Sequence, residues 1–132
     1  MKKDNNAFHI LRATLSLLLV FFITATVEAR PSDKWRLHVN GSANSDGTIV
    51  VSVQPVGGTP ITVQTQIEDG TRENMVAKEI TKAMKAQLSD DFKINRDDGE
   101  EVKINARMGR ADFELEVVSN TVKGVRVTTD RK

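Results

Sequence analysis

The chain has 132 residues, with 19 Lys and Arg, 18 Asp and Glu and no cysteine, and its formal net charge is +1. Three of the basic and two of the acidic residues lie among the first 29, so Arg30–Lys132 is formally neutral. This balance argues against nucleic-acid binding, which needs a basic surface that displaces counterions from phosphates. The lack of cysteine excludes thiol catalysis, Cys-based zinc sites and stabilisation by disulfides.

Residues 1–29 have the pattern of a cleavable secretory signal. Two lysines precede an uncharged apolar stretch centred on residues 17–23, and Val27 and Ala29 stand at the −3 and −1 positions of a cleavage site. The apolar stretch is shorter than the roughly 20 residues of a membrane-spanning helix, and Glu28 follows closely. We therefore expect processing after Ala29, a secreted or periplasmic location, and no membrane contact once the signal is removed.

After a polar linker at residues 30–34, we expect a single domain over residues 35–132. Its first part has a hydrophobic period of two. Apolar and polar residues alternate in three segments that begin at Trp35, Ile49 and Ile61. Turn-forming Asn, Asp, Gly and Pro residues separate these segments. The pattern predicts three strands, each with one buried and one solvated face.

The period then changes to 3.6 over a predicted helix from Arg72 to Leu88, with the Thr71 hydroxyl as its expected N-cap. One stripe of this helix is apolar and comprises Val76, Ile80, Ala83, Met84 and Leu88. The opposite side carries Lys78, Lys82 and Lys85. We expect this lysine row to be the solvated face, although it would also attract an acidic partner.

Four further strands are predicted after the helix. Phe92 and Ile94 lead into the turn Asp97-Asp98-Gly99, and an alternating segment from Val102 follows, which indicates a hairpin. Another strand begins at Phe113, and a last short one covers Val125–Thr129. The order βββ-α-ββββ predicts an α+β fold, an antiparallel sheet with one amphipathic helix packed on one face. Because one helix covers only about four strands, the others must extend the sheet, curl it or form a second layer.

The second part of the chain carries a family resemblance. The stretch PITVQTQIEDGTRENMVAKEITKAMKAQL, followed by FKINRDDGEEVKINARMGRADFELEVV, combines an alternating strand, a Gly-Thr step, a helix of the form VAxxIxxAM and a strand–turn–strand. In this respect Pro60–Asp130 resembles the βαββ modules of flagellin-type inserts and of phage tail and virion proteins. The resemblance implies a building block of extracellular filaments or particles, with no active site.

Catalytic residues are sparse. His38 is the only histidine beyond residue 29, and its place on a strand predicts that it faces the polar side. A general base needs an orienting partner and a metal site needs convergent ligands, and no second His or Cys is available. We therefore expect His38 to be an ordinary exposed residue. A triad would need one of six serines, none in a Gly-x-Ser-x-Gly elbow: Ser32, Ser42, Ser45, Ser52, Ser89 and Ser119.

The acidic residues are expected to serve turns and solubility. They occur as neighbouring pairs, Asp90-Asp91, Asp97-Asp98 and Glu100-Glu101. Neighbours on a strand point to opposite faces, whereas two catalytic carboxylates must face each other across a cleft.

Calcium binding stays open at two loops. An EF-hand alignment on Gly47 places Asp46, Asn44 and Ser42 at ligand positions, but Val53 stands where a bidentate Glu belongs. The loop at Asp97-Asp98-Gly99 fits this template no better, since Arg96 and Ile94 take ligand positions. Asn40-Gly41-Ser42 is a glycosylation triplet, which matters only in a eukaryotic source.

No catalytic, cofactor-binding or metal-binding residue is therefore assigned. The sequence favours an exported, small, non-enzymatic binding or structural module, and the resemblance suggests a subunit of an extracellular assembly. The alternative is a small envelope-targeted or secreted hydrolase, or an inhibitor of one.

The partner is an unknown protein or a second copy of the chain. Of the two terminal strands, Trp35–Asn40 carries Arg36 and His38, whereas Val125–Thr129 carries only Arg126. Charges protect an exposed strand edge against pairing with other chains. If the last strand lies at an edge, we expect it to mediate self-association or strand addition to a partner.

Overall fold

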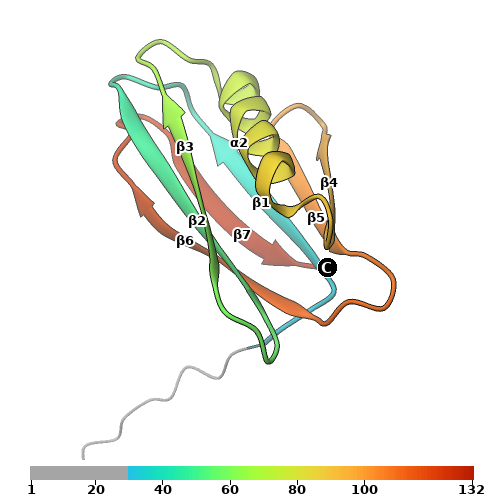
Figure 1. Cartoon of the computed structure of the whole chain (residues 1–132). Coiled ribbons are helices and arrows are strands. Elements are labelled where there is room, and N and C mark those ends of the chain that lie inside the picture. Colours follow the sequence, from blue (N-terminus) through green and yellow to red (C-terminus); the bar gives the residue numbers. More distant parts are fainter. Residues whose placement is uncertain (1–29) are drawn as a thin grey trace, which may run out of the picture.

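A computed structural model describes residues 30–132, which are drawn in colour in Figure 1. The predicted signal segment and its cleavage site lie outside the described residues. The elements follow the predicted order and confirm the α+β fold: β1 (Lys34–Asn40), β2 (Gly47–Pro55), β3 (Ile61–Ile67), α2 (Glu73–Leu88), β4 (Phe92–Asp97), β5 (Glu101–Ala106), β6 (Phe113–Asn120) and β7 (Arg126–Arg131).

The strands form two antiparallel sheets. One sheet has the order β4-β5-β1-β7, and the other has the order β3-β2-β6. In Figure 1, β6 and β2 lie to the left of β7 and β1, while α2 runs between β3 and β4. Of the three arrangements that the strand pattern left open, the structure adopts a second layer. The helix therefore contacts both sheets, β3 on one side and β4, β1 and β5 on the other.

The core lies between the two sheets and under the helix. Because side chains alternate along a strand, the apolar set of each strand points inward. The first sheet contributes Trp35, Leu37, Val39, Ile94, Val102 and Ile104, and the second contributes Ile49, Val51, Val53, Val63 and Leu115. All of these side chains are buried, as the period of two in the sequence predicts.

An aromatic contact joins the two sheets at one end. Trp35 of β1 donates its indole N–H to the backbone oxygen of Phe113 at the start of β6, at 2.7 Å. The Phe113 ring packs edge-on against Phe92, with centroids 4.8 Å apart. Ser32, inside the segment predicted as a linker, forms an isolated bridge with Phe113. The two sheets are thus tied together by hydrogen bonds as well as by apolar packing.

Helix α2 presents the faces that its sequence predicts. Val76, Ile80 and Met84 are fully buried between the sheets. The lysines at positions 78, 82 and 85 are exposed on the other side. No helix within residues 30–132 is long and apolar enough to cross a membrane.

The predicted N-cap of the helix is wrong. Arg72 occupies the N-cap position, and no side chain caps it. Thr71 stands one residue too early, so its hydroxyl donates to the Glu68 carbonyl at 2.7 Å and closes the preceding turn. The Glu73 carboxylate, in the first turn, accepts the backbone N–H of Gly41 at 2.9 Å and ties the helix start to the loop after β1.

Two glycines allow the loop after β1 to meet the loop before β7. Gly41 and Gly124 have φ values of +84° and +82°, in the left-handed region that favours glycine. A side chain on Gly41 would collide with the carbonyl oxygen of Gly124, and one on Gly124 would collide with that of Ser42. This close backbone approach lets the connections on one end of the sheets pack together.

Candidate functional site

The last strand lies at a sheet edge, as the partner hypothesis requires. β7 pairs with β1 alone, whereas β1 lies between β5 and β7 and is not an edge. The strand runs from Arg126 to Arg131, so it starts one residue later and ends two residues later than predicted. Val125 precedes it as a buried residue. Only β7, of the two terminal candidates, is therefore placed to accept another chain.

The hydrogen bonds between β7 and β1 show which backbone groups of β7 have no strand partner. Lys132 N–H donates to the Lys34 carbonyl at 3.1 Å. Antiparallel strands alternate between residues that bond to the neighbour and residues that face away. Given the register of β1 and β7, the backbone groups of Val127 and Thr129 face away from β1. Between the charged ends of β7, the residues Val127, Thr128 and Thr129 carry no charge.

His38 has a carboxylate partner that the sequence did not reveal. It lies half-buried on the outer face of the four-stranded sheet, with Nδ1 3.1 Å from Glu101 Oε1. The register of β1 and β5 places Glu101 directly opposite His38, although 62 other residues separate them in the chain. Only the pairing of two distant strands creates this contact, so no local motif signals it. On the other side, β7 places Thr128 opposite His38.

The same carboxylate oxygen also binds a cation. Arg36 Nη1 lies 3.0 Å from Glu101 Oε1, and Arg36 Nε is buried without a hydrogen-bond partner. Next along the face, Lys103 forms an ion pair with Asp97. The hydrogen bond from Lys103 to Asp97, together with its positive charge, holds the pKa of that carboxyl below its usual value. This face is thus a network of paired charges, in which His38 shares its partner.

Within the described residues, three carboxylates lie near enough to one another to hold a cation. Oxygen atoms of Asp97, Asp98 and Glu101 lie within 4.8 Å of one another. Two of the three carboxylates are already engaged, Asp97 by Lys103 and Glu101 by Arg36 and His38. Because Lys103 and Arg36 offset the local negative charge, we assign no metal to this cluster.

In the loop between β1 and β2, the other loop compared with a calcium site, the polar side chains form hydrogen bonds to the backbone. Asp46 Oδ1 accepts the backbone N–H of Asp69 at 2.8 Å, and Ser45 Oγ accepts that of Lys123 at 3.0 Å. These bonds tie the loop between β1 and β2 to two other connections.

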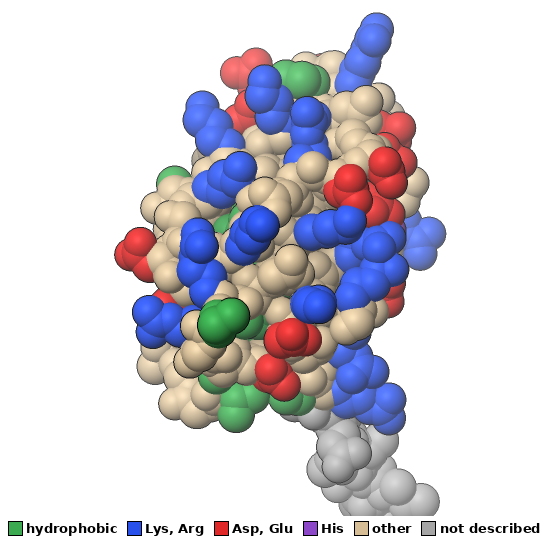
Figure 2. All heavy atoms as spheres, turned by 90° about the vertical axis from the view of Figure 1, so that its right-hand side faces the viewer, with side chains coloured by type: hydrophobic (Ala, Val, Ile, Leu, Met, Phe, Trp, Pro, Cys, Tyr) green, Lys and Arg blue, Asp and Glu red, His purple; other side chains and the backbone are tan. Residues whose placement is uncertain are grey.

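The flank of α2 that faces β4 forms a basic groove. Two adjoining hollows of about 520 and 450 Å³ share Lys85 and Asn95 in their linings. Their cationic residues are Lys78, Lys82, Lys85, Lys93, Arg96 and Arg107, and neither lining contains an Asp or Glu. Figure 2 looks at this side of the molecule and shows Lys and Arg gathered on it, with most acidic side chains at its margins. We call this surface the basic groove.

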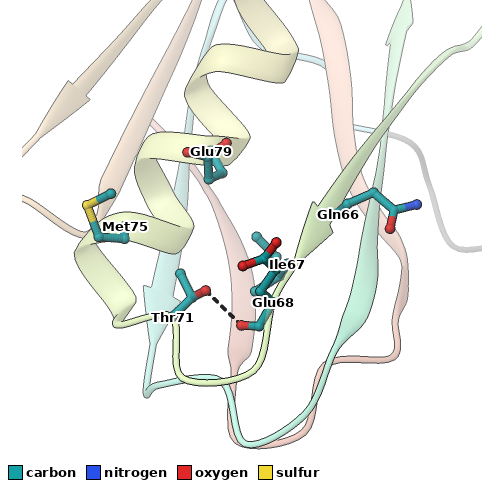
Figure 3. Close-up of a pocket in the computed structure, with 6 residues that line it drawn as sticks. All are labelled: Gln66, Ile67, Glu68, Thr71, Met75 and Glu79. Carbon is teal, nitrogen blue, oxygen red and sulfur yellow. Dashed lines mark hydrogen bonds between the residues drawn. The ribbon is translucent and has the colours of Figure 1, made fainter.

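The opposite flank of α2 has the other sign of charge. A hollow of about 310 Å³ lies between α2 and the end of β3, and Glu68, Thr71 and Glu79 line it together with three uncharged residues. Figure 3 shows Glu68 and Glu79 coming from opposite walls of this hollow, and the Thr71 hydroxyl bound to the Glu68 carbonyl. The helix thus separates an acidic flank from a basic one.

No protein-family model matches the chain, and no curated protein matches it.

Proposed function

We propose that this protein is an exported, non-enzymatic binding module that joins a partner or a second copy of itself through the free edge of β7. It then serves as a small subunit of an extracellular assembly. The observation that carries the proposal is the position of β7: it is hydrogen-bonded to one strand, β1, and its centre is uncharged. The signal-like residues 1–29 support export, and the resemblance of Pro60–Asp130 supports a role in assembly.

The other strand edges in residues 30–132 are less suited to this role. β4 carries Lys93 and Arg96, and these like charges oppose pairing with the same edge of a second copy. β6 has an irregular register opposite Val50 and Val51, and such a bulge interrupts the regular row of backbone groups. β3 is uncharged, but α2 packs against it, as it also does against β4. β7 contacts β6 but pairs with no strand on its outer side, and its centre carries no charge.

Because the backbone groups of β7 alternate between facing β1 and facing away from it, the outer edge can be tested selectively. Proline at Val127 removes an N–H that faces away from β1, so the pairing with β1 survives. Proline at Thr128 removes an N–H that faces β1, so it serves as the matched control that damages the fold itself. Light scattering of the purified protein should show an assembly that Val127→Pro reduces to monomers, while its circular dichroism stays unchanged.

A wild-type protein that stays monomeric at high concentration would contradict self-association and leave only a foreign partner for this edge. An assembly that survives Val127→Pro would contradict the use of β7 altogether.

The contact between His38 and Glu101 favours the second candidate, a small hydrolase. A carboxylate that orients a histidine is one part of a catalytic triad. Against this candidate, Glu101 is shared with Arg36, and His38 lines neither of the hollows beside β4. Measuring the hydrolysis of extracellular polymers by the wild-type protein and by His38→Gln distinguishes the hydrolase from the binding module. A thousandfold loss of activity in the variant would support the enzyme.

A further inference from the structure

We propose that the basic groove binds an acidic segment of a partner polypeptide in extended form, which adds to β4 as a further strand. The inference rests on the proposed function as a binding module, but it uses a different surface from β7.

Charge segregation is the first argument. Residues 30–132 are formally neutral as a whole, yet the lining of the basic groove holds six cations and no acid. None of the ion pairs in the described part of the chain involves these six side chains. A concave surface lined by one sign of charge concentrates its field and attracts the opposite sign. The groove is therefore complementary to an anionic ligand.

Two of the cations are held in place by the backbone. Arg96 Nη1 donates to the carbonyl of Asn74 in the first turn of α2 at 3.1 Å. Arg107 Nε donates to the carbonyl of Ser89, the C-cap of α2, at 2.8 Å. Carbonyl oxygens orient a guanidinium without cancelling its charge. The two ends of the groove thus carry oriented positive groups, which lowers the conformational cost of binding.

The free edge of β4 favours a ligand that has a peptide backbone. The backbone N–H of Arg107 donates to the Asp91 carbonyl at 2.9 Å. Together with the register of β4 and β5, this bond shows which residues of β4 are hydrogen-bonded to β5. By alternation, the backbone groups of Phe92, Ile94 and Arg96 face away from β5. No other strand of the described fold pairs with β4 on that side. An extended peptide can bond to these groups, as in strand addition.

The spacing of Lys78 and Lys82 is close to the repeat of an extended acidic segment. Along α2, Lys82 stands about 6 Å beyond Lys78, and Lys85 stands about 4.5 Å further, at 1.5 Å per residue. Alternate side chains of a strand repeat at roughly 6.6 Å. A strand with Glu or Asp at every second position can therefore direct its carboxylates toward the lysine row, while its other side chains point away.

Nucleic acid fits this groove less well. Proteins that bind single strands stack the bases on exposed aromatic side chains. The only aromatic residue in the groove lining is Phe92, which is 2% exposed and packs in the core.

The test uses the full exported protein and a fluorescein-labelled peptide that alternates Glu and Thr over seven residues. Fluorescence anisotropy should show binding that weakens as NaCl is raised. The double variant Lys78→Glu, Lys82→Glu should raise Kd at least tenfold. The matched control Lys34→Glu, Lys123→Glu makes the same change in net charge at exposed residues outside the groove, and it should change Kd less than twofold. Equal effects of the two double variants would overturn the proposal.

Amide hydrogen exchange distinguishes strand addition from simple charge attraction. Binding of the peptide should protect the N–H groups of Phe92 and Ile94. Polyacrylate, which has no peptide backbone, should bind without protecting them. If polyacrylate binds as tightly as the peptide and these two amides stay unprotected in both complexes, the groove is a general polyanion site and the proposal fails.

The proposal for β7 and the proposal for the basic groove can be tested independently of each other. Val127→Pro acts on β7 and should leave the Kd of the acidic peptide unchanged. If, instead, the peptide does not bind and Lys78→Glu, Lys82→Glu dissolves a salt-sensitive self-assembly, the occupant of the groove is a second copy of the chain, and the acidic-partner proposal is wrong.

Discussion

Truncation of Ile80 measures how much the fold depends on the packing of α2 between the two sheets. Ile80 is fully buried in the middle of the helix. Ile80→Ala removes three carbon atoms, which costs about 2.4 kcal/mol of transfer free energy at about 0.8 kcal/mol per group. The cavity that remains adds to this, so we expect a loss of about 3 kcal/mol, inside the range of about 2–5 kcal/mol typical of such changes.

A loss of about 3 kcal/mol lowers the Tm of a domain of this size by roughly 12–24 °C. Thermal unfolding followed by circular dichroism measures the shift. The matched control is Lys82→Ala, two residues along the same helix but exposed, which should change stability by less than about 0.5 kcal/mol. If both alanine variants melt at the same temperature, Ile80 does not dock the helix and the packing described above is wrong.

Further predictions concern charge, backbone conformation, the histidine and processing. The Lys103 ammonium lowers the pKa of the Asp97 carboxyl, so this pair contributes stability that is present above the usual carboxyl pKa and is lost as the pH falls through the lowered pKa. Lys103→Met should therefore flatten this part of an acid-unfolding curve, and an unchanged curve would refute the coupling. Gly124→Ala places a side chain at φ +82° against a facing backbone carbonyl and should cost more than about 1 kcal/mol in urea unfolding; a neutral substitution would mean that the loops are not in close contact. His38→Gln should leave assembly and peptide binding within a few-fold of wild type by light scattering and anisotropy, whereas loss of both would give the histidine an essential role. Intact-mass analysis of the exported protein should show cleavage after Ala29, and a mass that includes residues 1–29 would contradict the signal peptide.

Local patterns predicted the elements of this fold because burial imposes a period on each of them. Strands with one buried face repeat every two residues, and the helix repeats every 3.6, so the element order could be predicted. The turn at Asp98 and Gly99 was equally recognisable, and both residues have positive φ. The error at Thr71 has a local cause as well. A threonine near a helix start can cap the helix or close the turn before it, and the choice depends on a shift of one residue.

Candidate sites were much less predictable than elements. The contact of His38 with Glu101, and the meeting of Lys85 with Asn95 in one groove, join residues from different elements. The lysine row of α2 was recognised as a solvated face that would attract an acidic partner. The continuation of this row across β4 and Arg107 depends on where the helix docks. The hydrophobic period of the sequence does not predict that position.

The sequence by itself determined most of the buried residues of the strands and the helix, because a buried face favours an apolar side chain at each repeat. It also determined the order of the elements and the absence of cysteine chemistry. Only the tertiary structure decided that the strands divide into two sheets, that β1 is central, and that β7 and β4 have free edges. Strand pairing joins segments far apart in the chain, and its energy comes from backbone groups that every residue carries. The alternation of side chains specifies the face of a strand but not its neighbour.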